Sequence, residues 1–492
     1  MSNEKIKLNL NDYRDRVYAC WIGKNIGGTM GGPFEGTHDM PKIDGFITAP
    51  GKPLPNDDLD LQLVWLHAME NLGIKNVNAS TLGELWLSYI TADWSEYGVA
   101  KVNMKNGIMP SMSGDYQNAW ADSNGAWIRT EIWASLMPGC PELAAKYAIE
   151  DAKVDHGCAE GTVSAAFVAF MQSAAFVIHD LRKCIDLALA AIPEDSRTAT
   201  SVRLAIECYE NSTPFRDARN LIQNRNSDIG DGWFEAPSNV AYTVLGMLYG
   251  EGDFKKSLIL AIQCGDDTDC TAATVGATLG ILGGTKVIPE DLKTHIGDDI
   301  ITIAIDKTSV GSKFPKTCRD LTDRVVKLAP HILFALEADV ELSLTDDAIP
   351  DDIEKIIADK SKGTLTSSTV RPDTVKYTST LFSADAEFEG GPDILPTGTK
   401  NIKLTFNNNI SVFDAENYSL SFRWWLPEGF KVDGPSGMIL RNVVYVRYDR
   451  FAREAEFKIS CPECIDRTNR CVLEVTAEGR PTPLYIPIVL LG

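Results

Sequence analysis

The amino-acid sequence predicts a large all-α domain followed by a C-terminal β-sandwich. Over residues 1–345, apolar side chains recur every three or four positions, as in DLDLQLVWLHAMENLG and AEGTVSAAFVAFMQSAAFVIHD. This spacing is typical of amphipathic and buried helices. Strands and helices do not alternate there, so a doubly wound parallel sheet is not expected. Residues 346–380 are polar and rich in Asp, Lys, Ser and Thr, and we interpret them as a linker with one short helix.

Residues 381–492 have a different pattern. Short runs such as KNIKLTF, YSLSFRWW, VVYVRYD and CVLEVTAEG are β-branched and aromatic, and Gly, Pro and Asn separate them. This pattern predicts an antiparallel β-sandwich of immunoglobulin-like size.

Composition narrows the range of partners and compartments. The 492 residues carry a net charge of −21, which argues against nucleic acid and anionic membranes as partners. The N-terminal residues contain no apolar core of a signal peptide. Most of the 11 cysteines stand alone in helical segments, which favours reduced thiols and a cytoplasmic protein. The motif CPECIDRTNRC has no fourth metal ligand nearby, so we interpret its cysteines as structural thiols rather than a zinc site.

The segment QCGDDTDCTAATVGATLGILGG places three carboxylates directly before an apolar helix. One carboxylate there would cap the helix, but Asp266, Asp267 and Asp269 repel one another and favour a bound cation. We expect Asp267 and Asp269 to face the cation, and Asp266 to cap the helix or face solvent. Small residues recur along one face of this helix at Ala272, Gly276, Gly280 and Gly283. A capped helix that packs closely against another helix therefore remains an alternative to a metal site.

Two further clusters have a similar character. In PLPNDDLDLQLVWL, the polar residues Asn56, Asp57, Asp58 and Asp60 stand at the start of an apolar helical pattern. In GKNIGGTMGGPFEG, a glycine-rich stretch precedes Glu35. Those glycines do not form a nucleotide-binding loop of the Walker type, because no Gly-Lys-Ser/Thr ends the run and no strand precedes it. Several acidic clusters in one helical domain favour a shared site.

Taken together and in this order, GGPFEG, NDDL and GDDTDC resemble the motifs of the ADP-ribosylglycohydrolase family. Further similarity lies in DSNGAWIR and AKVDHGCAEGTVSAAF, and the resemblance covers roughly residues 12–290. It implies an all-α ADP-ribosylglycohydrolase-like domain with a site for two Mg²⁺ ions, with Mn²⁺ as an alternative. The resemblance also implies the metal ligands, which are Glu35, Asn56, Asp57, Asp58, Asp267, Asp269 and Cys270.

Cys270 departs from the family pattern. The family has a hydroxyl at that position and at the position of Asn56. An asparagine still offers a carbonyl oxygen, but a thiol is a poor ligand for a hard cation. Thr271 is one residue away and points about 100° around the helix. We therefore expect one of the two metals to bind weakly.

The expected chemistry follows from the ligand types. Five carboxylates carry a charge of about −5 and two divalent ions supply about +4, and oxygen ligands favour Mg²⁺ or Mn²⁺ over zinc. Such ions can chelate a ribose diol and activate water for attack at an anomeric carbon. Glu35 or Asp58 is the expected general base.

Three residues are candidates for substrate binding. Asn124 and Gly125 are expected to line the path of the ribose or pyrophosphate, although a plain turn is the alternative. His156 lies where the family often has a histidine, although a packed histidine with satisfied hydrogen bonds is the alternative. Aromatic residues between Trp94 and Trp133 are candidates for stacking on a ring or for core packing.

The leading hypothesis is a Mg²⁺-dependent hydrolase that cleaves an N- or O-glycosidic bond to ribose in an ADP-ribosylated or small-molecule substrate. One alternative is a glycoside or nucleoside hydrolase of the same fold with another substrate. Another is a non-catalytic member of the family that binds a ligand. The sequence leaves the oligomeric state and the role of the β-domain open.

Overall fold

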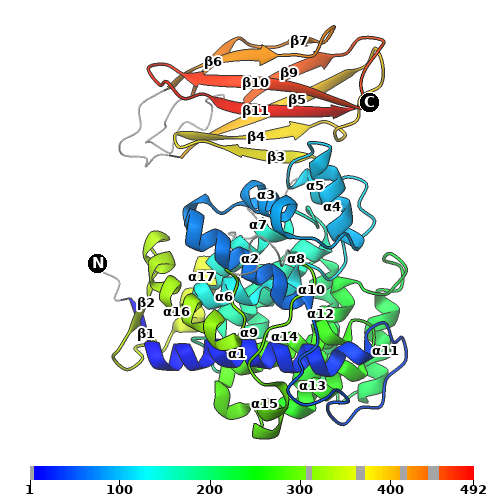
Figure 1. The fold of residues 1–492 in the computed structure, drawn as a ribbon, viewed down its shortest axis with the longest axis vertical. Helices are drawn as coiled ribbons and strands as arrows, with labels where there is room; N and C mark the ends of the chain where they lie inside the picture. Colours follow the sequence, from blue (N-terminus) through cyan, green and yellow to red (C-terminus); the bar gives the residue numbers. More distant parts are fainter. Residues whose placement is uncertain (1–4, 306–312, 362–371, 410–417, 441–453) are drawn as a thin grey trace.

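The computed structural model describes residues 5–305, 313–361, 372–409, 418–440 and 454–492. It has the two parts that the sequence predicts, a helical domain and an antiparallel β-sandwich stacked on one end of it (Figure 1). The fold class is therefore confirmed. The strand expected at VVYVRYD, residues 443–449, lies outside the described residues.

The helical domain contains the following helices: α1 (Leu10–Gly31), α2 (Asp57–Leu72), α3 (Ala79–Tyr89), α4 (Ser95–Lys105), α5 (Met112–Asp115), α6 (Glu131–Leu136), α7 (Pro141–Ala152), α8 (Glu160–Ala174), α9 (Leu181–Ala191), α10 (Arg197–Glu210), α11 (Phe215–Arg225), α12 (Ala236–Gly250), α13 (Phe254–Gln263), α14 (Thr268–Gly283), α15 (Glu290–Ile296), α16 (Cys318–Ala335) and α17 (Ile353–Ser361). Short 3₁₀ helices lie at Gly32–Phe34, Ile74–Asn76, Trp127–Arg129 and Thr285–Val287.

Helices α1 and α14 pack antiparallel with their backbones in contact. A Cβ atom added to Gly27 would lie 2.1 Å from the carbonyl oxygen of Ala272, and one added to Gly276 would lie 2.1 Å from the carbonyl oxygen of Gly23. At the end of α1, a Cβ on Gly31 would lie 2.2 Å from the carbonyl oxygen of Thr268. Only residues without a side chain permit this approach. The small-residue face of α14 thus meets a matching face of α1, and the end of α1 lies at the start of α14.

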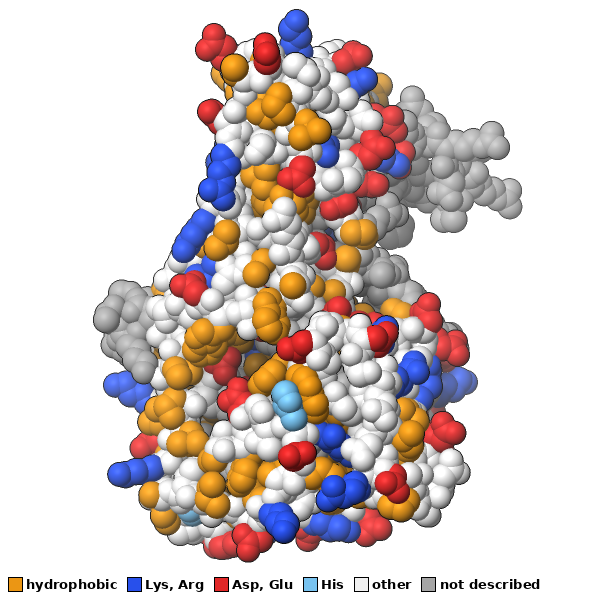
Figure 2. Space-filling model, turned by 90° about the vertical axis from the view of Figure 1, so that its right-hand side faces the viewer, with side chains coloured by type: hydrophobic (Ala, Val, Ile, Leu, Met, Phe, Trp, Pro, Cys, Tyr) orange, Lys and Arg blue, Asp and Glu red, His pale blue; other side chains and the backbone are white. Residues whose placement is uncertain are grey.

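The most apolar stretch of the sequence forms α8 at the centre of the helical domain. Nearly every residue from Ser164 to Ala174 is fully buried. No helix among the described residues has the length and apolar character needed to cross a membrane. On the face of the molecule drawn in Figure 2, acidic and basic side chains are interspersed over both domains.

The range 346–380, which the sequence assigns to a linker, contains parts of both domains. Helix α17 is the short helix expected there, and its residues Ile353 and Ile357 belong to the core of the helical domain. Before it, β2 (Val340–Ser343) pairs in parallel with β1 (Ile6–Asn9). After it, β3 (Thr374–Thr378) already pairs with the next strand of the sandwich. Apolar residues at two-residue spacing in TVKYT explain why this short run becomes a strand.

The sandwich consists of two antiparallel sheets. Their strands are β3, β4 (Phe382–Phe388), β5 (Thr399–Asn408), β6 (Tyr418–Trp425), β7 (Lys431–Asp433), β8 (Gly437–Leu440), β9 (Glu454–Ser460), β10 (Thr468–Ala477) and β11 (Leu484–Leu491). One sheet has the order β3-β4-β5-β9-β7 and the other β11-β10-β6-β8. Alternate residues face the core between the sheets, for example Ile402, Leu404 and Phe406 in β5.

The two domains are joined by a segment of the helical domain that enters the core of the sandwich. Ile108 and Met112 are each about 1% exposed and belong to the apolar cluster of the sandwich. Beside them, the Tyr116 hydroxyl donates to Asp393 at 2.6 Å, and the Ser111 hydroxyl donates to the carbonyl oxygen of Thr374 at 3.0 Å. The segment directly follows α4, so the sandwich helps to hold that helix.

Candidate metal centre and pocket

A pocket of about 540 Å³ opens where α2, α4 and α14 begin. Carboxylates from these three helices and from the loop after α1 line it: Glu35, Asp57, Glu96, Asp267 and Asp269. Aromatic side chains form part of the wall, among them Trp94, Tyr97 and Trp120. The pocket therefore combines a strongly acidic floor with flat apolar surfaces.

The close packing of α1 and α14 creates the acidic floor. Because Gly31 lies against Thr268, the loop that carries Glu35 passes beside the first turn of α14. Backbone hydrogen bonds fix the loop, since Gly36 donates to the carbonyl oxygen of Asp266 at 2.9 Å and Asp266 donates to that of Thr37 at 2.7 Å. Helix N-termini carry a partial positive charge, which favours the carboxylates at the starts of α2 and α14.

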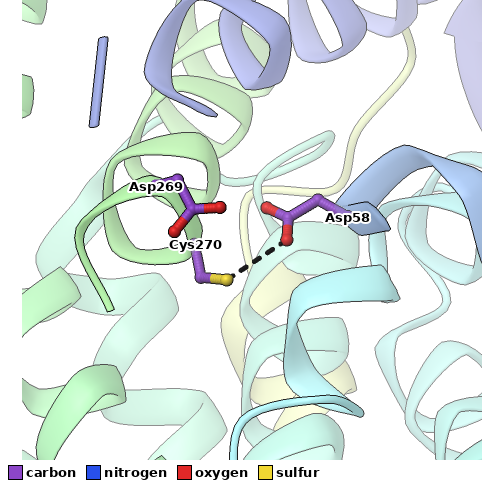
Figure 3. Close-up of side chains that lie close together, drawn as sticks. All are labelled: Asp58, Asp269 and Cys270. Carbon is purple, nitrogen blue, oxygen red and sulfur yellow. Dashed lines mark hydrogen bonds between the residues drawn. The ribbon is translucent and has the colours of Figure 1, made fainter. Parts of the chain in front are cut away.

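Four carboxylates at this site form two groups that share Asp269, and Glu96 forms a further group with Asp155 and His156. Potential ligand atoms of Glu35, Asp267 and Asp269 lie within 4.8 Å of one another, and so do those of Asp58, Asp269 and Cys270. Figure 3 shows Asp269 and Cys270, at the start of α14, opposite Asp58 of α2. The Oδ1 atoms of Asp267 and Asp269 are buried and have no hydrogen-bond partner within the protein. Buried acceptors of this kind are costly unless something compensates them.

Burial changes the ionisation of this floor. Burial raises the pKa of Asp267 to about 8 and that of Asp58 to about 7. It raises the pKa of Asp269 well above its usual range, and the neighbouring Asp267 carboxylate adds to this shift. A divalent cation would favour the ionised forms and would compensate the unpaired oxygens. Carboxylate oxygens also suit Mg²⁺ and Mn²⁺. The Glu35, Asp267 and Asp269 group fits such an ion.

Asp58 differs from the other carboxylates because a buried lysine lies beside it, although its Oδ2 atom has no hydrogen-bond partner among the described residues. Its Oδ2 atom lies 3.4 Å from the Nζ atom of Lys24, and its Oδ1 atom accepts a hydrogen bond from the Cys270 thiol at 3.2 Å. Lys24 is 1% exposed, and its Nζ atom also lies 3.2 Å from Glu131. Burial alone would lower the pKa of Lys24, but the carboxylates of Asp58 and Glu131 raise it overall. The sequence analysis did not identify Lys24.

Comparison with known proteins identifies the helical domain. The sequence profile of the ADP-ribosylglycohydrolase family matches residues 9–325. The chain belongs to the ADP-ribosylglycohydrolase family. One solved structure, described as an ADP-ribosylglycohydrolase-related protein complex, is 17% identical and aligns with a TM-score of 0.42 over 65% of this chain and 99% of that chain. No curated protein matches the sequence. Family membership supports hydrolase activity in general, and the β-sandwich lies beyond the match.

The residues that stand at the family's motif positions do not all remain available as ligands. Asn56 is the N-cap of α2, and its side-chain oxygen accepts the backbone N–H of Asp58 at 2.7 Å. Its Nδ2 atom lies 2.2 Å from where a Cβ of Gly28 would be. The predicted carbonyl ligand is therefore used for capping. Asp57 lines the pocket and accepts a hydrogen bond from the Tyr97 hydroxyl at 3.2 Å.

Asn124 and Gly125 lie in the pocket wall, but Asn124 also acts on the acidic floor. Its Nδ2 atom donates to Asp267 at 2.7 Å, and its oxygen accepts from the indole of Trp127 at 2.9 Å. Asn124 therefore orients Asp267. A Cβ on Gly125 would lie 2.2 Å from a carboxylate oxygen of Glu96, so the absence of a side chain makes room for Glu96.

His156 lies outside the pocket. Its ring is fully buried, with Nδ1 2.9 Å from the carbonyl oxygen of Ala121 and Nε2 3.5 Å from Asp155. The ring does not line the pocket, but it lies close to Glu96 of the pocket wall, so its role in substrate binding stays a prediction. Its Nε2 atom is buried without a hydrogen-bond partner in the described part of the chain, so the packed alternative with satisfied hydrogen bonds does not describe the residue fully.

Asp266 is also corrected. It neither faces solvent nor caps α14, because it is fully buried and accepts hydrogen bonds from the backbone N–H of Phe234 at 2.9 Å and from the Asn239 amide at 2.8 Å. Asp266 therefore ties the loop before α12 to the start of α14. Its side chain organises the loops around the site and does not belong to either carboxylate group.

Glu96 is a pocket residue that the sequence analysis missed. It is 7% exposed and accepts a hydrogen bond from the Ser123 hydroxyl at 2.8 Å. Next to it, the rings of Trp94 and Tyr97 stack with centroids 6.2 Å apart. The concentration of aromatic residues from Trp94 onward did indicate a possible ring-binding surface. Glu96 gave no separate signal, since a single acid at a helix start is common.

Proposed function

We propose that this chain hydrolyses a glycosidic bond to ribose in an ADP-ribosylated substrate, with a divalent cation, Mg²⁺ or Mn²⁺, held by Glu35, Asp267 and Asp269. The observation that carries this proposal is the pair of buried, unpartnered Oδ1 atoms of Asp267 and Asp269 at the floor of an open pocket. A protein without a ligand there has no reason to gather such groups. We further propose a cytoplasmic location, which the unpaired cysteines favour.

The side chains suggest how the reaction would proceed. When bound, the cation would supply a Lewis acid that binds ribose oxygens and lowers the pKa of water. Water attacks the anomeric carbon, and the bond to the leaving nitrogen or oxygen breaks. Glu35 accepts a proton from the water and returns it to the leaving group. Glu35 suits this role better than Asp58, because Glu35 is exposed and lines the pocket, whereas Asp58 is fully buried and does not line it.

A direct assay tests this proposal. ADP-ribosylated arginine and serine peptides are incubated with the protein in Mg²⁺, in Mn²⁺ and in a chelator, and free ADP-ribose is measured. We expect release only with a divalent cation. Asp267→Asn should abolish it, whereas Asp195→Asn, which changes an exposed carboxylate, should leave it unchanged. Release that continues in the chelator, or in Asp267→Asn, would contradict the metal-dependent mechanism.

One observation favours a second candidate, an uncharged ribosyl glycoside such as a nucleoside. Among the described residues that line the pocket there is no Lys, Arg or His side chain, whereas a pyrophosphate is commonly bound by cationic side chains. The same assay on a panel of nucleosides separates the two candidates. Turnover of neither class, with metal bound, would favour a non-catalytic binding protein.

A further inference from the structure

We propose that the Lys24 ammonium group takes the place of one metal ion at this centre, so that each chain binds one divalent cation rather than two. This inference rests on the proposed function, because it takes the Glu35, Asp267 and Asp269 group as the site of the remaining ion. It differs from the sequence-based expectation of two ions, one of them weakened by Cys270.

The first argument is that Asp58 already lies between a fixed cation and a thiol, so its charge is compensated without a second metal ion. Lys24 lies 3.4 Å from one oxygen and the Cys270 thiol lies 3.2 Å from the other. Both Lys24 and Asp58 are almost completely inaccessible to solvent. Loss of either partner from a buried ion pair leaves an uncompensated charge, so the pair strongly resists separation.

The second argument is the poor donor set of the Asp58 group. Its other members are Asp269, which the group shares with the Glu35 group, and the soft sulfur of Cys270. A second divalent ion would have to displace the thiol proton and sit beside a fixed ammonium group of the same sign. The group of Glu35, Asp267 and Asp269 contains neither a thiol nor an ammonium group, and it offers the unpartnered Oδ1 atoms of Asp267 and Asp269.

The third argument is that the protein fixes Lys24 from its other side. Glu131 lies 3.2 Å from the ammonium group. Its two oxygens accept hydrogen bonds at 3.0 Å from the side-chain amides of Gln62 and Gln172. Lys24 thus lies between carboxylates of α2 and α6, and the hydrogen bonds to Glu131 fix the carboxylate on the α6 side. Lys24 does not line the pocket, so it is a positioning residue that acts through Asp58.

The test is a count of bound Mn²⁺ ions per chain, measured by electron paramagnetic resonance during titration of the full-length protein. We expect one ion for the wild type and one for Cys270→Ser, which replaces the soft donor but retains Lys24. We expect two ions for Lys24→Met, which removes the charge at similar volume. Lys101→Met is the matched control, since Lys101 is also buried but pairs with Asp93, and it should bind one ion.

Each outcome decides between the two proposals. Two ions in the wild type would overturn this inference and leave the proposed function intact, whereas no bound ion would overturn both. A second ion in Cys270→Ser but not in Lys24→Met would assign the exclusion to the thiol and overturn the role of Lys24. If Lys24→Met does not fold, the wild-type and Cys270→Ser counts decide, because a second ion in either one contradicts the inference.

Discussion

Replacement of Gly27 by alanine should damage both the stability of the fold and the metal centre. The added methyl group would lie 2.1 Å from the carbonyl oxygen of Ala272 and 2.3 Å from its carbonyl carbon. Ordinary contacts between such atoms begin at about 3.5 Å, so α1 and α14 would have to separate by about 1 Å or more. Because both neighbours are backbone atoms, no side-chain rotation can relieve the contact.

The expected magnitude combines two opposing effects. Overpacking of a tight interface costs about 1–3 kcal/mol and sometimes more. Alanine also stabilises a helix by about 1 kcal/mol relative to glycine. The protein therefore loses stability only if the cost of overpacking exceeds this gain in helix propensity. A shift of about 1 Å is half of a typical metal–oxygen distance of about 2.1 Å. We therefore expect the Kd for Mn²⁺ to rise at least about tenfold.

Urea denaturation and Mn²⁺ titration measure these two effects separately. Gly45→Ala is the control, because its added Cβ would meet only the flexible end of Lys255 at 3.6 Å, and its stability should change by less than about 0.5 kcal/mol. The reasoning is refuted if Gly27→Ala is as stable as the wild type and binds Mn²⁺ equally well. That result would mean that the small residues of the two helices do not set the position of the carboxylates.

Two other predictions concern the pH dependence of metal binding and the sandwich. In the folded protein the pKa values of Asp58 and Asp267 are about 7 and about 8, whereas the value in the unfolded chain is near 3.9. The metal-free folded state therefore binds more protons than the unfolded state. Its stability should fall as the pH rises from about 5 to 8. Mg²⁺ displaces those protons, so the Tm measured in Mg²⁺ should exceed the Tm measured in a chelator by an amount that increases over that pH range. A constant difference between the two Tm values would contradict this prediction. In the sandwich core, Met112→Ala should cost about 2–4 kcal/mol in urea denaturation because Met112 is about 1% exposed, whereas Met109→Ala, a change at the edge of the same cluster, should cost less.

The carboxylate clusters could be predicted from the sequence because each is local. Asp267 and Asp269 stand two positions apart at the start of a helix, and their mutual repulsion is visible without knowledge of the fold. The glycine spacing of α14 likewise predicted close packing, and Gly23 and Gly27 of α1 provide the matching surface. Each of these signals lies within one short segment of the sequence, so it can be recognised before the fold is known. The fold then brings the segments together.

Lys24, Asn56 and His156 could not be interpreted in the same way. A lysine in a helix is usually solvated, and only the positions of Asp58 and Glu131 on two other helices reveal that Lys24 is paired and buried. The carbonyl oxygen of Asn56 can either cap a helix or bind a metal, and the local backbone decides in favour of the cap. For His156, the sequence does not show that the ring is fully buried beside Asp155.

The sandwich has a structural connection to the pocket through α4. The first turn of α4 carries Glu96 and Tyr97 into the pocket wall, and the segment after α4 enters the core of the sandwich. Asn103, near the end of α4, ties the helix to that segment, since its amide donates to the carbonyl oxygens of Ser113 and Tyr116 at 2.9 and 2.8 Å. The proposed metal ligands lie at the start of α14 and in the loop after α1, and the hydrogen bonds of Asn103 do not involve them. A mutation that destabilises the sandwich should therefore affect the pocket wall formed by α4 more than it affects the metal centre.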